Sequence, residues 1–348
     1  MSMKGAGART PYAAWVREEG LTVQSGNYQR DLRTVDLVPW ERLGCLGTIL
    51  NHDKSNESND CWVVEIPPGG SVRPERHLFE EMVYVLSGHG ATQLFDEVGG
   101  TVTHTFEWST GSLFAIPLNM PHEYFNGDSE EPVRLLMVTN APVIINNFRS
   151  MDFVFDTLYQ FTDRFAGEKD GFNGSGSLEG RVWSTNFIAD VGAFELIDYP
   201  ERGGGGRNVQ LVLGGNSMKA HISEFPVGQY KKAHRHGAGA HVVVLEGQGY
   251  TLMWRGDDKP TRYDWGPGSL IVPPDGFFHQ HFNTGATPAR YLALRYLDNR
   301  IFNAEGVPLS NISTRLGGDQ IEYEDEHDEI RAEYERELAA NGVTIPES

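Results

Sequence analysis

An internal repeat is the feature that most constrains the fold of this 348-residue chain. Short motifs from the first half return in the second half, in the same order and at nearly constant spacing. The clearest pairs are Glu65–Gly69 with Glu224–Gly228, Val83–Gly90 with Val242–Gly249, and His122–Asn126 with His279–Asn283. Agreement at several motifs in series predicts two copies of one structural unit. The length agrees, because one core rarely serves more than about 250–300 residues.

Each copy is predicted to consist of short β-strands. Forty glycines and eighteen prolines punctuate the chain between runs of aliphatic, aromatic and β-branched residues. Short strands with frequent turns are typical of an all-β barrel or sandwich. The clearest predicted strands are Cys61–Ile66, Met82–Leu86, Ser112–Ile116, Arg134–Val138, Val209–Leu213, His241–Leu245, Ser269–Val272 and Arg290–Leu294.

The repeat also predicts the domain organisation. We expect an N-terminal arm, a first domain, a linker with a Gly-rich loop, a second domain and an acidic tail, at residues 1–43, 44–142, 143–207, 208–298 and 299–348. In the tail, Ile330, Tyr334 and Leu338 are spaced by four residues. This spacing places them on one face of a helix. A C-terminal helix that packs on a barrel or on a second subunit is therefore predicted.

Charge and composition narrow the classes of partner and location. Asp and Glu outnumber Lys and Arg by 48 to 29, a net charge of −19. Such a surface repels phosphate backbones and anionic lipid, so no nucleic acid and no membrane is expected as a partner. Residues Met1–Arg9 lack the apolar segment of a secretory signal. Cys45 and Cys61 have no CxxC spacing and are expected to be free thiols, so we predict a cytoplasmic protein.

The second copy contains a candidate metal site. His234 and His236 are two residues apart, so both side chains can lie on the same face of a strand. His279, from a later strand, can meet them there. Three imidazoles suit Zn, Cu, Fe or Ni and leave positions open for water, oxygen or substrate. The alternative is that the three histidines only fill the interior of the domain.

The first copy contains a weaker candidate for a second metal site. Glu75 stands where the second copy has its leading histidine. Carboxylates and imidazoles both bind Mn, Fe or Zn, so a site made of Glu75, His77, Glu81 and His122 is chemically sound. Arg73 and Arg76 add positive charge nearby. A degenerate site that now serves only the folding of the domain is therefore an equal alternative.

These histidines lie in motifs that resemble those of the cupin family, in both copies. The resemblance implies an all-β bicupin, in which two double-stranded β-helix (jelly-roll) barrels stand in tandem and a C-terminal helix follows. The family's usual carboxylate ligand falls at Ala240 in the second copy and at Glu81 in the first. His241 is the nearest substitute for that ligand, but strand parity turns it away from the barrel interior.

An alanine in the carboxylate position resembles the gentisate and salicylate 1,2-dioxygenases, which are three-histidine Fe(II) bicupins. The resemblance implies a mononuclear non-haem Fe(II)-dependent dioxygenase that acts on a phenolic or enolic small molecule with O2. It gives His281 an acid–base role. Those enzymes grip the substrate carboxylate with an arginine where this chain has Val242, so gentisate and salicylate are expected to be poor substrates. Arg255 and Arg295 are expected at the surface or the rim.

Other functions fit the same motifs. A metal that acts only as a Lewis acid would support an isomerase, lyase or hydrolase. A cupin that binds a small molecule without catalysis is a further alternative. Fe(II) is the metal that the resemblance favours, with Mn, Zn, Ni and Cu as alternatives, and the family's habit implies a homo-oligomer.

Overall fold

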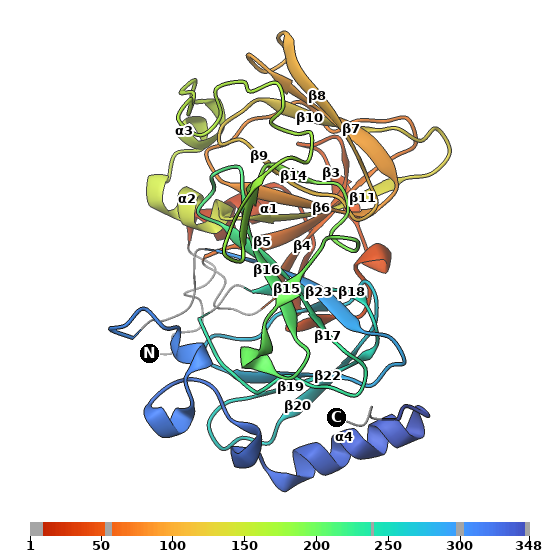
Figure 1. The fold of residues 1–348 in the computed structure, drawn as a ribbon. Helices are drawn as coiled ribbons and strands as arrows, with labels where there is room; N and C mark the ends of the chain where they lie inside the picture. The colour runs from red at the N-terminus through yellow and green to blue at the C-terminus, as the bar shows by residue number, and fades with distance from the viewer. Residues whose placement is uncertain (1–9, 53–57, 238–239, 297–302, 345–348) are drawn as a thin grey trace, which may run out of the picture. The chain divides into compact units, whose positions relative to one another are not determined.

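The structure is a computed structural model that describes residues 10–52, 58–237, 240–296 and 303–344. Strands dominate the fold and helices are few (Figure 1). Each of the eight strands predicted above is present, so the all-β prediction is confirmed. The chain divides into two compact units: unit 1 is Met1–Gly26, Arg33–Ala193 and Leu211–Lys219, and unit 2 is Asn27–Leu32, Phe194–Gln210 and Ala220–Ser348.

Unit 1 contains the first barrel. Its larger sheet has the order β1-β4-β5-β11-β6-β9-β14, with β3 beside β4, and a smaller sheet has the order β10-β7-β8. The bounds are β1 (Val23–Gly26), β3 (Val38–Trp40), β4 (Cys45–His52), β5 (Asp60–Ile66), β6 (Glu81–Ser87), β7 (His89–Phe95), β8 (Val102–Ser109), β9 (Leu113–Ile116), β10 (His122–Asn126), β11 (Val133–Thr139), β12 (Ser177–Glu179), β13 (Val182–Thr185) and β14 (Phe187–Ile188). Alternate residues of these strands form the apolar core of the barrel.

Unit 2 repeats this arrangement. Its larger sheet includes the order β16-β17-β23-β18-β21-β2, and a smaller sheet has the order β20-β19-β22. The bounds are β2 (Tyr28–Gln29), β15 (Ile197–Asp198), β16 (Arg207–Leu213), β17 (Lys219–Phe225), β18 (His241–Glu246), β19 (Gly249–Trp254), β20 (Thr261–Trp265), β21 (Leu270–Ile271), β22 (Phe278–Asn283) and β23 (Ala289–Arg295). Two facing sheets in each unit, antiparallel apart from the parallel pair of β1 with β4, are the jelly-roll barrel that the sequence predicted.

Each barrel receives its edge strand from the segment that precedes the other barrel. The strand β2 precedes the first barrel but pairs with β21 in unit 2, whereas β14 precedes the second barrel but pairs with β9 in unit 1. The same side-chain contact holds both segments: Ser269 Oγ donates to the Arg30 carbonyl, and Ser112 Oγ donates to the Ala189 carbonyl, each at 2.7 Å. The internal repeat therefore extends further than the motifs analysed above, to Ser25–Asp31 and Ser184–Asp190.

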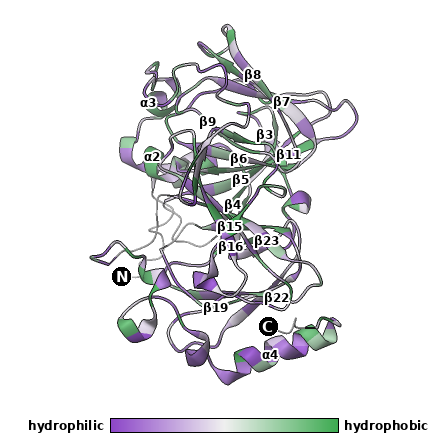
Figure 2. Ribbon diagram, viewed as in Figure 1, coloured by the Kyte–Doolittle hydropathy of each residue, from purple (hydrophilic) through white to green (hydrophobic). Residues whose placement is uncertain are grey.

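The helices lie outside the barrels. They are α1 (Pro11–Glu18), α2 (Ala141–Phe148), α3 (Met151–Asp156) and α4 (Asp328–Ala340), with short 3-10 turns η2 (Leu32–Thr34), η3 (Pro200–Arg202), η4 (Leu309–Asn311), η5 (Thr314–Leu316) and η6 (Tyr323–Asp325). The predicted C-terminal helix is confirmed as α4. Its buried residues Tyr334 and Leu338 pack with Tyr250 and Phe282 of the second barrel. The rest of α4 is mostly hydrophilic (Figure 2).

None of the helices among the described residues is both long enough and apolar enough to cross a lipid bilayer.

Candidate metal centre

Three imidazoles converge in the second barrel, as the sequence predicted. His234 and His279 are bridge partners whose backbone N–H groups donate to each other's carbonyls at 3.1 and 2.9 Å. This pairing brings their ring centroids to 4.2 Å, and the ring of His236 lies 4.7 Å from that of His279. One potential ligand nitrogen from each ring lies within 4.8 Å of the other two. Three nitrogens this close can surround one divalent ion.

The backbone fixes which ring nitrogen is available. The Nδ1 atoms of His234, His236 and His279 lie 3.3, 2.7 and 3.3 Å from the carbonyl oxygens of Lys232, Gly237 and Phe277. A carbonyl can only accept, so each Nδ1 carries the proton and each Nε2 carries the lone pair. Metal-binding histidines are oriented in this way in most sites, by a second hydrogen bond on the far nitrogen. The three rings therefore fit a metal ion.

Burial keeps the rings of His234 and His279 neutral. Desolvation holds the pKa of His234 well below its ordinary value, and the charge of Arg202 lowers it further. Desolvation and the neighbouring His236 do the same to the pKa of His279. A neutral imidazole is the form that binds a metal, so the lone pairs are available at neutral pH and below it.

The position of the usual carboxylate is apolar in this barrel. Ala240 is buried and brings no ligand atom. His241 is buried on β18 but does not belong to the cluster of ligand atoms. Val242 and Val244 on the same strand line a small interior cavity. Alternate residues of β18 therefore face inward, and His241 faces the other way, as the sequence predicted. Val242 is thus an inward-facing apolar residue.

His281 lies beside the three imidazoles without joining them. Its ring centroid is 5.7 Å from that of His279, and its Nδ1 is 2.7 Å from the hydroxyl of Thr251. That hydroxyl also accepts a hydrogen bond from Trp265 Nε1 at 3.0 Å, so Trp265, Thr251 and His281 form one hydrogen-bonded chain. Thr251 therefore fixes the orientation of the His281 ring through Nδ1. Burial, followed by the charge of Lys231, lowers its pKa to about 3, so the ring is neutral.

The sequence analysis missed a group of polar residues inside the same barrel. Lys231 is only 4% exposed, and its ammonium donates to Ser223 Oγ at 3.0 Å and to the Tyr291 hydroxyl at 3.1 Å. A comparison of the two copies could have revealed this group. The first barrel has the apolar residues Val64, Val72 and Leu135 at the positions of Ser223, Lys231 and Tyr291. Arg295 was also placed wrongly at the rim: it is 6% exposed and donates to Gln210. Arg255 is exposed, as expected.

A second cluster of ligand atoms lies in the first barrel. Atoms of Glu75, His77 and His122 lie within 4.8 Å of one another. The Nδ1 atoms of both histidines contact backbone carbonyls, at 2.8 and 2.9 Å. Within the described part of the chain, the two buried Nε2 atoms have no hydrogen-bond partner. A buried polar atom without a partner is costly, so this cluster also fits a metal ion.

Glu81 and Glu75 are each bound to another side chain in the first barrel. Glu81 accepts a hydrogen bond from the Tyr124 hydroxyl, while its other oxygen lies 3.7 Å from His77 Nε2. Burial raises its pKa to about 8. Glu75 forms an ion pair with Arg42 at 2.8 Å. Tyr124 stands where the second barrel has His281, so the pair Glu81 and Tyr124 corresponds to Ala240 and His281.

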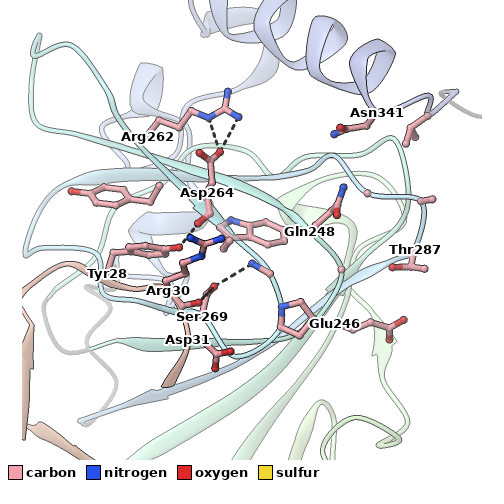
Figure 3. Close-up of a pocket in the computed structure, with 18 residues that line it drawn as sticks. Tyr28, Arg30, Asp31, Glu246, Gln248, Arg262, Asp264, Ser269, Thr287 and Asn341 are labelled. Carbon is pink, nitrogen blue, oxygen red and sulfur yellow. Dashed lines mark hydrogen bonds and ion pairs between the residues drawn. The ribbon is translucent and has the colours of Figure 1, made fainter. Parts of the chain in front are cut away.

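A wide hollow in unit 2 has none of these histidines in its lining (Figure 3). This open groove of about 1180 Å³ is lined by the outer turns of the barrel and by Tyr28, Arg30 and Arg262. Arg262 is already bound to Asp264, Glu333 and Glu337. The cavity next to His281 and Tyr291 is far smaller, about 10 Å³, which is roughly the room that one water needs. The interior is therefore the candidate functional site, because the converging imidazoles and the buried cation are there.

The comparisons with known proteins agree with this fold. The cupin domain family matches residues 62–139 and 221–295. One matched segment lies in unit 1 and the other in unit 2. A search of curated proteins by sequence gives no match.

The similar solved structures include several of oxalate decarboxylase. One, an arginine-to-alanine mutant of the Bacillus subtilis enzyme, has a TM-score of 0.51 and 13% identity over 80% of this chain and 78% of that chain. Another, concerned with the Mn(II) centres of the B. subtilis enzyme, has a TM-score of 0.51 and 14% identity over the same shares. Identity this low establishes the two-barrel fold alone. The resemblance to gentisate-type dioxygenases continues to rest on the sequence motifs.

Proposed function

We propose that this chain is a metal-dependent lyase-type bicupin that removes CO2 from a small carboxylate in its second barrel. The observation that carries the proposal is the convergence of His234, His236 and His279, with a potential ligand nitrogen of each within 4.8 Å of the other two. A barrel that served only as a scaffold would gain nothing from three desolvated imidazoles. The lyase alternative is favoured over the dioxygenase because the similar structures are Mn(II) decarboxylases.

The charges around the site favour an anionic substrate. Lys231 is buried, and within the described residues its ammonium contacts a serine and a tyrosine but no carboxylate. The charges of Lys231 and Arg202 both lower the pKa of His281, so both act on the space beside the cluster. A buried cation without a counter-ion is stabilised when an anion binds next to it. A substrate carboxylate would provide that anion.

In this proposal the residues of the site have separate roles. His234, His236 and His279 would hold a divalent ion, with Mn(II) and Fe(II) as the candidates. Bound there, the ion would supply Lewis acidity that draws electron density from the substrate oxygens. His281 would contact the substrate through its Nε2, and Val242 would limit the bulk of the substrate. We propose the first-barrel cluster of Glu75, His77 and His122, near Glu81, as a second metal site.

The decisive experiment is metal analysis followed by a substrate screen. Protein loaded separately with Mn(II) and Fe(II) is incubated with small carboxylates, including oxalate, and CO2 release and O2 uptake are recorded together. The proposal predicts CO2 release that His236→Ala abolishes and that proceeds without stoichiometric O2 uptake. O2 uptake with phenols or enols, and no CO2 from any carboxylate, would reject the lyase and restore the Fe(II) dioxygenase.

A further inference from the structure

The Tyr291 hydroxyl is held by a buried lysine in the interior of the second barrel. Lys231 Nζ donates to it at 3.1 Å and also donates to Ser223 Oγ at 3.0 Å. The ammonium lies 4.8 Å from the centroid of the tyrosine ring. Tyr291 lines the small cavity together with His281, and their ring centroids are 5.4 Å apart. The hydroxyl is thus fixed in place, close to the space beside the metal-binding cluster.

This polar group is specific to the second barrel. Tyr291 pairs with Val244 just as Leu135 pairs with Val85 in the first barrel. Counted along the repeat, the counterparts of Lys231 and Ser223 are Val72 and Val64, and all three counterparts are buried. The first barrel shows that this fold packs well with apolar residues at all three positions. Packing therefore does not explain a buried lysine and its partners.

We propose that Tyr291 is the proton donor of the second barrel and that Lys231 is its positioning residue. The inference rests on the lyase function proposed above. Loss of CO2 breaks the bond between the carboxylate and its neighbouring carbon and leaves the electron pair on that carbon. The Tyr291 O–H bond then breaks, its proton forms the new C–H bond, and the phenolate is stabilised by the Lys231 ammonium. A proton from solvent restores the hydroxyl, so one proton is consumed for each CO2 released.

The charges that face Tyr291 favour this role. Lys231 faces it from the segment after β17, His221 from β17, and His281 from β22, and the charge of Arg202 in η3 acts on it as well. Burial alone would raise the pKa of Tyr291, but the Lys231 charge and the hydrogen bonds of Ser223 and Lys231 outweigh burial and lower it. A tyrosine whose pKa lies closer to neutral is better suited to proton transfer near pH 7.

Ultraviolet titration of the metal-free protein tests the pair without any substrate. Phenolate absorbance is followed against pH in the wild type and in Tyr291→Phe, and the difference reports Tyr291 alone. We expect the transition below the ordinary tyrosine value of about 10, and above it in Lys231→Met. Tyr124→Phe is the matched control, because the pKa of this other buried tyrosine is raised by burial and by Glu81. A Tyr291 transition at or above the ordinary value, or one that ignores Lys231→Met, would overturn the proposal.

Turnover measurements then test whether Tyr291 donates the proton. Tyr291→Phe should keep its metal content and lose on the order of 10²- to 10⁴-fold in kcat. Tyr263→Phe, which removes the hydroxyl of a half-buried tyrosine on β20, should be unaffected. Full kcat in Tyr291→Phe rejects the proton donor. If Tyr291 titrates below the ordinary tyrosine value but no acid is decarboxylated, the proposed function is rejected instead, and the Tyr291–Lys231 pair remains established.

Discussion

Metal binding should stabilise the protein by an amount that can be calculated in advance. If metal binds only the folded state, metal at 100 times Kd adds about 2.7 kcal/mol for each occupied site. The entropy of unfolding is about 2.1 cal/mol/K per residue, or about 0.7 kcal/mol/K for 348 residues. One occupied barrel should therefore raise Tm by about 4 °C, and two barrels by about twice that.

Differential scanning fluorimetry of metal-free protein, titrated with Mn(II), measures this shift. His234→Ala removes one of three ligands in the second barrel and should remove that barrel's share. His122→Ala does the same for the first barrel, where Glu75 and His77 complete the cluster. His89→Ala is the matched control, because that histidine is exposed at the start of β7, a strand that contains none of the proposed ligands. A shift that survives His234→Ala and His122→Ala together would mean that the metal binds elsewhere.

Three further predictions follow from contacts in the second barrel and from the buried titratable groups. Thr251→Val removes the hydrogen bond that fixes the ring of His281, and turnover should fall on the order of tenfold, for a loss of about 1.4 kcal/mol, with metal content unchanged. Five buried imidazoles have lowered pKa values, so below about pH 6.5 the unfolded metal-free chain binds more protons than the folded one. The free energy of unfolding, measured by urea titration, should therefore fall as the pH is lowered, by up to about 1.4 kcal/mol per proton and pH unit. Glu81 offsets one proton of this effect, because its pKa is raised in the folded state and acts in the opposite direction. Tyr334→Ala removes a buried ring of α4 and its hydrogen bond to the Asn283 carbonyl, and should cost about 3–5 kcal/mol by urea unfolding while α4 loses its contact with the barrel.

The repeat allowed the strands and the principal cluster of histidines to be predicted from the sequence. Strand parity on β18 turned Val242 inward, because a period of two residues is a local property of the chain. His234 and His236 converge as expected, but the structure has only an isolated bridge at His234 and no strand at His236. The stripe on α4 was predictable for the same reason. These features depend on residues that are close in sequence or repeated at equal spacing.

The features that were missed depend on pairing between distant segments. Lys231 looks like a surface lysine in the sequence, and only the contacts with Ser223 and Tyr291 reveal it as buried. Arg295 ends a strand that packs against β17, and its partner Gln210 comes from an element more than eighty positions earlier. A comparison of the two copies at every position, beyond the motifs, would have marked Lys231, because its counterpart Val72 is apolar.

The reciprocal edge strands make the two barrels unsuitable as separate expression units. A fragment that ends after β11 would lack β14 and leave β9 with an unpaired edge, and a fragment that begins at β16 would lack β2 and expose β21. Bare edges of this kind favour aggregation. A stable single-barrel fragment would therefore have to include the segment that supplies its edge strand: Phe187–Ile188 for the first barrel and Tyr28–Gln29 for the second.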